Sequence, residues 1–183
     1  DDLKSPNTIR WEPSRGARIG VVLRDDPAAP VRWYEIAPCY VFHPMNAFDD
    51  GEAVVLDIVR YPRLPLFDPG GENPNTPFAE YPAGRLLRLR LDLATGHTSE
   101  TILDETPCEF PAVDPRRALR RHRHGWIAAR RGPVCGRGIM NAIGHVDFET
   151  GKVDYRDLGP STYTNEPLFL PRTEDAPEGD GYL

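Results

Sequence analysis

A six-residue pattern that occurs twice constrains the fold of this chain more than any other feature. Residues 92–97 (DLATGH) return 55 residues later as residues 147–152 (DFETGK), so both copies read D-x-x-T-G-x. Each copy lies between stretches of alternating apolar and polar residues, and its glycine supplies the positive φ that a hairpin turn requires. The pattern therefore predicts two β-hairpins, with turns at 94–96 and 149–151.

Short β-branched and aromatic runs fill most of the remaining chain. Proline (20 residues) and glycine (16 residues) interrupt them throughout, and no long window has a helical period. The chain is therefore predicted to be all-β, with less than about 10% helix. A stretch rich in Pro, Gly and Asn, residues 66–84, is expected to form a long loop. Strands are expected within residues 18–24, 31–37, 39–43, 53–61, 86–93, 125–131 and, as a hairpin, 145–155.

The spacing of the two hairpins favours a β-propeller. A separation of 55 residues suits one four-stranded blade of roughly 40–50 residues together with its loops. The hairpins would then be outer strands of successive blades, and the residues after each hairpin would begin the next inner strand beside the central axis. Residues 1–183 are expected to form a single partial propeller domain of about three to four blades, as a segment of a longer chain.

Composition narrows the classes of partner. The net charge is −6, and no basic stripe offsets it, so nucleic acid is not an expected partner. An arginine cluster within residues 116–123 is interpreted as a solvated loop. No stretch approaches the roughly 20 apolar residues of a membrane span. Any membrane contact is therefore expected to come from parts of the protein outside this chain.

The cysteines indicate a reducing compartment. Cys39, Cys108 and Cys135 are widely spaced and odd in number. They fit neither a disulfide framework nor a zinc pattern, and we interpret them as small buried side chains. The expected location of the protein is the cytoplasm.

Three units of the chain each place an ionisable residue among aromatic and proline neighbours. Glu109 follows Asp92 by 17 residues within PCEFPAVDP, and Glu166 follows Asp147 by 19 residues within TNEPLFLPR. His43 ends the run VRWYEIAPCYVFH in the same manner. In a propeller these three positions would begin inner strands and converge on the axis.

One histidine and two glutamates that converge among apolar side chains favour a metal site. A buried carboxylate needs a hydrogen-bond donor, and an imidazole whose other nitrogen binds a metal provides one. Taken singly, His43 also suits a core histidine that donates to a backbone carbonyl. Both interpretations stay open on the residues alone.

Three ordered motifs carry a resemblance to a known family. The first is WYEIAPCYVFHPMNAFDDGEAVVLDIVRYP, with an H-x-x-N-A core at residues 43–47. The others are CEFPAVDPRRALRRHRHGWIAA and TNEPLFLPRTEDAPEGDGYL. These segments resemble, in order, the central motif, the E-F-P segment and the E-P-x-F-x-P block of the carotenoid cleavage oxygenases. The resemblance covers residues 9–183.

The resemblance implies a seven-bladed β-propeller around one Fe(II) ion. In this family four histidines from four inner strands bind the iron, and three glutamates hydrogen-bond three of those histidines. By resemblance, His43 is the third of the four ligands, and Glu109 and Glu166 are two of the three glutamates. Glu109 is expected to accept the Nδ1–H of His43, which leaves Nε2 for iron. Glu166 is expected to serve a histidine outside this chain.

The activity implied by the resemblance is that of a dioxygenase. It would cut one C=C bond of a carotenoid, apocarotenoid or stilbene-type substrate with O₂ and give two carbonyl products. With one ligand of four, this segment alone is expected to be inactive. Two other classes stay open: a catalytically inert propeller segment that acts as a scaffold, and a calcium- or zinc-dependent propeller hydrolase. A calcium site would require several oxygen ligands.

The other histidines are interpreted as structural or solvated. His97 occupies the turn position that Lys152 holds in the second copy. His122 and His124 lie in or beside the arginine-rich loop. The interpretation that these two histidines together bind a metal is weaker than the interpretation that they are solvated. His145 is expected to be structural, on a strand that faces away from the axis. No catalytic residue is predicted beyond the metal site.

Overall fold

The computed structural model describes residues 11–65, 83–132 and 140–183. Within these ranges the chain forms twelve β-strands, two short 3-10 turns, η2 (Pro13–Arg15) and η4 (Pro115–Arg117), and no α-helix. The all-β prediction is confirmed. Most of the loop predicted at 66–84 lies outside the described residues, as does Cys135. No helix in the described ranges is long and apolar enough to cross a membrane.

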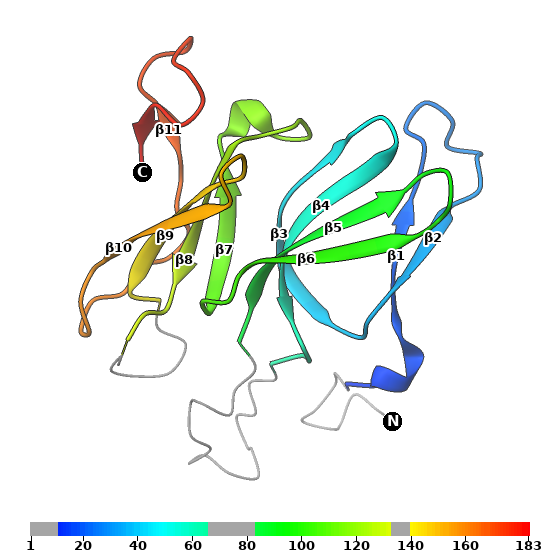
Figure 1. Cartoon of the computed structure of the whole chain (residues 1–183), viewed down its shortest axis with the longest axis horizontal. Coiled ribbons are helices and arrows are strands. Elements are labelled where there is room, and N and C mark those ends of the chain that lie inside the picture. Colours follow the sequence, from blue (N-terminus) through cyan, green and yellow to red (C-terminus); the bar gives the residue numbers. More distant parts are fainter. Residues whose placement is uncertain (1–10, 66–82, 133–139) are drawn as a thin grey trace, which may run out of the picture.

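The strands form four antiparallel sheets that follow one another in chain order (Figure 1). The first and last are two-stranded and flank two four-stranded meanders. A meander in which each strand pairs with its sequence neighbours is a propeller blade, so the chain holds two complete blades between two smaller sheets. The sheets are β1 (Ala17–Val21) with β2 (Arg32–Ile36); β3 (Tyr40–Asp49), β4 (Ala53–Tyr61), β5 (Arg85–Asp92) and β6 (Thr98–Asp104); β7 (Cys108–Val113), β8 (His124–Ala129), β9 (Ala142–Asp147) and β10 (Lys152–Asp157); and β11 (Leu170–Pro171) with β12 (Gly181–Tyr182).

The repeated D-x-x-T-G pattern forms the turn of the outer hairpin in each complete blade. Oδ1 of Asp92 accepts the backbone N–H of Thr95 at 2.6 Å, and Oδ1 of Asp147 accepts that of Thr150 at 3.2 Å. The glycines that follow have φ of 77° and 69° at positions 96 and 151. A side chain that holds the turn and a glycine that permits positive φ explain both hairpins. Both were predicted from the sequence.

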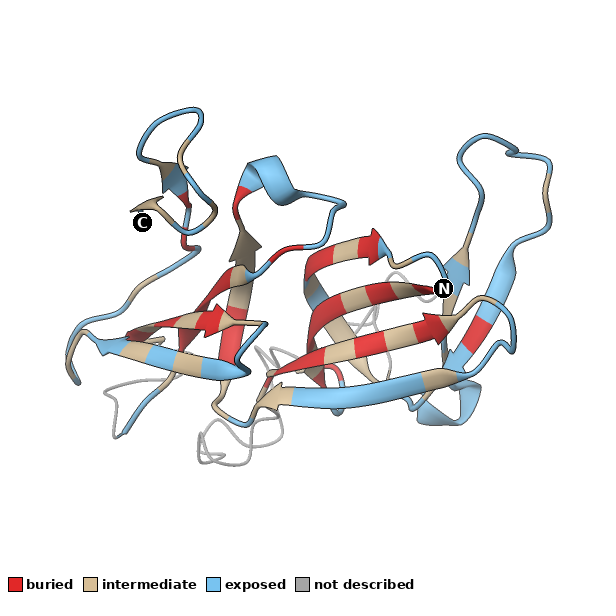
Figure 2. Ribbon diagram, turned by 45° about the horizontal axis from the view of Figure 1, so that its top comes forward, coloured by how far each residue is buried: buried red, intermediate tan, exposed pale blue. Residues whose placement is uncertain are grey.

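Buried residues lie mainly on the inner and middle strands, whereas β6 and β10 are mostly exposed (Figure 2). An apolar cluster lies between the two complete blades. It contains Met45, Val59, Tyr61, Leu86, Cys108, Ile127, Ala129, Ala142 and Val146. A second cluster of Ile58, Leu87 and Leu89 packs toward Ile19 and Ile36 of the first sheet. The blade of β3–β6 is therefore buried on both faces.

The cysteine prediction holds for Cys108, which is fully buried, whereas Cys39 is only half-buried. Burial raises the pKa of the Cys108 thiol to about 12, so it behaves as a small apolar side chain. Both of these cysteines are free thiols.

The core between the first sheet and the next blade can be tested with Leu89→Ala. Leu89 is 1% exposed, so in the full-length protein its truncation should destabilise the fold by about 2–5 kcal/mol. Ile102→Ala is the matched control, because Ile102 is 49% exposed on the neighbouring strand and should cost less than about 1 kcal/mol. Chemical denaturation measures both. Equal losses would show that this face of the blade is not a packed core.

Candidate metal centre

His43 lies on the inner strand β3, where the strand pairing is irregular. Between Val41 and Pro44, β3 advances three residues while its partner β4 advances two. A second extra residue follows between Pro44 and Asn46. Proline has no N–H for a ladder bond, and bulges of this kind turn side chains out of the regular alternation. The sequence around His43 thus bends β3 at the point where the imidazole projects.

Glu109 lies at a similar irregularity on the next inner strand, β7. From Glu109 to Ala112, β7 advances three residues while β8 advances two. Phe110, within the bulge, has a φ of 52°. A left-handed φ costs a non-glycine residue roughly 1–2 kcal/mol, and strain of this kind tends to gather at functional sites. Here it turns the N–H of Phe110 onto Oε2 of Glu109 at 2.6 Å.

His43 and Glu109 meet across the boundary between the two blades. Nδ1 of His43 lies 2.7 Å from Oε2 of Glu109. The histidine side chain is 43% exposed, and the glutamate side chain is 7% exposed. An ionised carboxylate only accepts hydrogen bonds, so the Glu109 contact places a proton on Nδ1 of His43, and in the neutral imidazole the lone pair is then at Nε2. The expected hydrogen bond between these side chains is present.

Aromatic rings surround the imidazole. The ring centroids of Phe110 and Phe42 lie 5.3 Å and 6.3 Å from that of His43, and Phe42 meets Tyr61 edge-on at 5.5 Å. Burial raises the pKa of the Tyr61 phenol, and the charge of Glu109 raises it further, so Tyr61 is neutral. Oε1 of Glu109 is buried and has no hydrogen-bond partner among the described residues. The His43 ring thus has aromatic neighbours while remaining partly exposed.

The residues present fit one corner of a metal centre. A metal-bound histidine usually donates its second ring N–H to a carboxylate or carbonyl, and His43 does so to Glu109. No hydrogen bond in the described ranges engages Nε2 of His43. Imidazole nitrogen suits iron, zinc, copper and nickel. The described residues contain no group of three or more His, Cys, Asp or Glu that could hold a metal, so this chain would supply one ligand of a larger set.

Glu166 does not join this pair. It lies in the extended segment between β10 and β11, where the neighbouring Pro167 and Phe169 are buried and Glu166 is exposed. No hydrogen bond or ion pair involves it among the described residues. Glu166 is exposed within this chain because side chains alternate along an extended segment and Glu166 has the outward position. Its expected partner, a histidine outside this chain, stays a prediction.

His97, His124 and His145 lie outside the candidate centre. His97 is exposed in the outer turn, as expected. Nε2 of His145 lies 3.0 Å from Nδ1 of His124, and the His145 ring stacks on Trp126 with ring centroids 5.8 Å apart. Burial and the adjacent His124 lower the pKa of His145. These contacts agree with a structural role.

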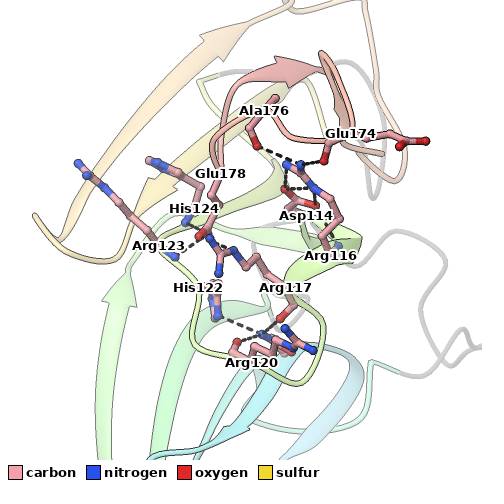
Figure 3. A network of polar contacts seen from close by, with 11 residues as sticks. Asp114, Arg116, Arg117, Arg120, His122, Arg123, His124, Glu174, Ala176 and Glu178 are labelled. Atoms are coloured by element: carbon pink, nitrogen blue, oxygen red, sulfur yellow. Dashed lines mark hydrogen bonds and ion pairs between the residues drawn. The ribbon is translucent and has the colours of Figure 1, made fainter.

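The arginine cluster lies at the surface, as predicted, but four of its side chains form ion pairs rather than being simply solvated, and Figure 3 shows part of this network. The partner of Arg116 is two residues away, and the other three partners are distant in the sequence. Oε1 of Glu178 also accepts the backbone N–H of Arg123 and His124, which ties the loop to the segment between β11 and β12. The ion pairs are Arg116–Asp114, Arg117–Glu178, Arg121–Asp50 and Arg123–Asp147.

The interpretation of His122 as part of a solvated loop is wrong, because its side chain is fully buried. Its Nδ1 lies 3.0 Å from Nδ2 of Asn46, and its ring packs on Phe148. Nε2 lies 3.4 Å from Oδ2 of Asp57 without a hydrogen bond. Burial lowers the pKa of His122.

The buried Asp57 forms an ion pair with the half-buried Arg88 that sequence reasoning missed. Both Oδ atoms of Asp57 accept from the Arg88 guanidinium at 2.8 Å. The two residues are direct partners in the β4–β5 register. An aspartate in the middle of the apolar run AVVLDIV, with arginines in the following strand, was the available signal.

Comparisons with known proteins agree with this architecture. The chain matches the family model described as retinal pigment epithelial membrane protein over residues 3–183. It is 34% identical to isoeugenol monooxygenase from Pseudomonas putida over 99% of this chain and 40% of that protein. It is 36% identical to lignostilbene-alpha,beta-dioxygenase isozyme III from Sphingomonas paucimobilis over 90% of this chain and 36% of that protein.

A solved structure shares the fold. The crystal structure of cobalt-substituted Synechocystis ACO superposes with a TM-score of 0.82 at 30% identity, over 94% of this chain and 35% of that chain. Apocarotenoid-15,15'-oxygenase from Synechocystis is likewise 30% identical, over 96% of this chain and 35% of its own length. The chain thus spans between about a third and two fifths of the length of these relatives.

The buried His122 predicts an acid-sensitive fold. Because its pKa is lowered in the folded state, the unfolded chain binds the proton more strongly, and stability is full above about pH 6.5, the ordinary histidine value. The thermal unfolding midpoint of the full-length protein should therefore fall as the pH drops from 7 to 5. His122→Gln should make this fall shallower, while His145, whose pKa is also lowered, contributes the remainder.

His97→Gln is the control for this experiment, because His97 is exposed in a turn and its loss should leave the pH profile unchanged. A profile for His122→Gln that coincides with the wild-type profile from pH 7 to 5 would contradict the assignment of His122 as a buried neutral histidine.

Proposed function

The chain belongs to the retinal pigment epithelial membrane protein family, and on that premise we propose that the full-length protein is a non-haem Fe(II)-dependent dioxygenase. Its substrate would be a hydrophobic alkene of the carotenoid, apocarotenoid or stilbene type. Reaction with O₂ would cleave one C=C bond and give two carbonyl products. The observation that carries the proposal is the His43–Glu109 pair, in which Nδ1 is held and Nε2 is open.

The relatives support the proposed class of reaction. Three of them are named as an isoeugenol monooxygenase, an apocarotenoid oxygenase and a lignostilbene dioxygenase. The cobalt-substituted form of a structural relative supports a metal-dependent site. An alkene substrate is consistent with the aromatic neighbours of His43, Phe42 and Phe110.

The residues of this chain would serve the reaction by binding and orientation. When bound, Fe(II) would supply the activation of O₂. His43 would hold the iron through Nε2, and Glu109 would fix the tautomer and direction of the imidazole through Nδ1–H. Phe42 and Phe110 would limit the access of water to this nitrogen. Because the Tyr61 phenol is neutral, it would add no second negative charge beside that of Glu109.

Glu166 would orient a second iron-binding histidine, outside this chain, in the same way. Its exposed position with no partner among the described residues leaves the carboxylate open to such a contact. Iron binding by four histidines with no anionic ligand would distinguish this centre from the common site of two histidines and one carboxylate.

The proposal predicts graded losses of iron. In the full-length protein, His43→Ala should abolish stoichiometric Fe(II) binding and O₂ uptake with a 4-hydroxystilbene or an apocarotenal. Glu109→Gln should weaken iron binding or turnover by about 10- to 100-fold, because the carboxylate that orients the ligand is lost. Bound iron is measured by elemental analysis after anaerobic loading.

His97→Ala is the control, because this exposed histidine lies in an outer turn and its loss should change neither quantity. If His43→Ala retained iron and cleaved substrate, His43 would not be a ligand. A wild-type protein with neither iron nor O₂ uptake would instead favour an inert propeller scaffold.

A further inference from the structure

The two strands that carry His43 and Glu109 belong to different sheets. β3 and β7 contact each other, but no backbone ladder joins them. The His43–Glu109 distance therefore depends on how one inner strand is placed along the other. Apolar packing between the blades is non-directional and does not by itself fix that placement to the roughly 0.5 Å that a functional site requires.

Asn46, three residues after His43 on β3, makes directional bonds across this boundary. Its Nδ2 donates to the carbonyls of Arg117 at 3.2 Å and Arg120 at 2.9 Å. Its Oδ1 accepts the backbone N–H of Leu119 at 2.9 Å. One buried amide thus holds three backbone groups of a single loop, residues 117–120, and we name this contact the Asn46 latch.

The conformation of the loop matches the latch. Leu119 has a φ of 63° and is 67% exposed, so side-chain packing does not account for its left-handed backbone. The bond from its N–H to Asn46 does, because this bond requires the N–H to turn inward. Phe110 and Leu119 are the two non-glycine residues with positive φ in the described ranges. Phe110 donates its N–H to Glu109, and Leu119 donates its N–H to Asn46.

His122 is a further neighbour of the Asn46 amide. The Asn46 amide has two N–H groups and three acceptors within reach, the third being Nδ1 of His122 at 3.0 Å. Nδ1 must then accept, which places the His122 proton on Nε2, facing Asp57. His122 thus lies between Asn46 and Asp57, whose carboxylate is held by Arg88 in the first complete blade.

A short rigid segment connects the latch to Glu109. After β7 ends at Val113, the buried carboxylate of Asp114 accepts the backbone N–H and the guanidinium of Arg116, and η4 leads directly into the latched loop. A shift of the loop would consequently move β7.

Several polar contacts join the two blades, among them Arg121 with Asp50, Tyr155 with Asp104 and the N–H of Cys108 with the carbonyl of Gly84. Among the described residues, the Asn46 latch and the His43–Glu109 hydrogen bond are the two that side chains of β3 make.

We propose that Asn46 is a positioning residue of the metal centre, whose amide sets the register of β7 against β3 and so holds Glu109 in reach of Nδ1 of His43. This inference rests on the proposed function, because it assumes that His43 binds a metal. It gives the asparagine of the H-x-x-N motif a role that is neither ligation nor contact with substrate.

The test uses Co(II) titration of the metal-free full-length protein, followed by the visible absorption of the bound ion. Asn46→Ala should raise the Co(II) dissociation constant by about 10-fold, within the range that loss of outer contacts causes. Asn46→Asp, which keeps the shape and the acceptor but loses both donors, should act in the same direction. Thermal unfolding confirms that each variant is folded.

Asn141→Ala is the matched control. Asn141 is also buried, and it donates to the carbonyl of Arg131 at 2.9 Å while accepting the N–H of Arg131 at 2.8 Å. Asn141 therefore holds a loop through the same amide groups, but it does not contact the loop of residues 117–120 that Asn46 binds. Its loss should leave the Co(II) affinity at His43 within about 2-fold of wild type, a change of less than about 0.5 kcal/mol that is typical of uncoupled sites.

A double-mutant cycle separates positioning from a general effect on the fold. If Asn46 acts through Glu109, then Asn46→Ala in a Glu109→Gln background should change the dissociation constant by less than about 2-fold, since the contact is already lost. If Asn46→Ala raised the Co(II) dissociation constant 10-fold both in the wild-type protein and in Glu109→Gln, the proposal would be overturned. It would also be overturned if Glu109→Gln weakened Co(II) binding while Asn46→Ala left it unchanged. A wild-type protein that binds no Co(II) would overturn the proposed function itself, and the positioning role with it.

Discussion

The hydrogen bond between Nδ1 of His43 and Oε2 of Glu109 joins two blades that share no backbone ladder. It fixes which imidazole nitrogen is open, and it requires two inner strands to be bent and aligned. Bulges in β3 and β7 aim the two side chains at each other. The left-handed Phe110 supplies a second donor to the same carboxylate oxygen. Three of the four register shifts among the described strands thus lie beside His43 or Glu109, and the fourth lies between Leu86 and Leu87.

The blades themselves depend on local interactions, and their relative placement depends on distant ones. Each outer hairpin is held by one aspartate and one glycine within six residues. Between the blades, an apolar cluster excludes water, and buried polar groups add direction. Asn46 of β3 binds the loop after η4, and Arg121 of that loop pairs with Asp50. Because a buried polar group is costly unless it is hydrogen-bonded, the contacts of Asn46 favour one arrangement of the two sheets.

Local sequence signals predicted the hairpins and the strands, because each depends on residue types at fixed short spacing. The His43–Glu109 contact joins residues 66 apart in the sequence, and it was expected from the resemblance to a known family. The burial of His122 and the pairing of the arginine loop were not predicted, because partners such as Asp57, Asp50 and Glu178 lie 61 to 71 residues away along the chain. The exposure of Glu166 within this chain was not predicted for a related reason: apolar neighbours bury an extended segment on one side only, and the sequence alone did not say which side.

The most direct test of the central claim is a crystal structure of the iron-loaded full-length protein, with anomalous scattering measured at the iron edge. The proposed centre requires an anomalous peak within bonding distance of Nε2 of His43, with Nδ1 still hydrogen-bonded to Glu109. An iron peak bound through Nδ1, or bound at a site that excludes His43, would contradict the proposed ligand role and the function built on it.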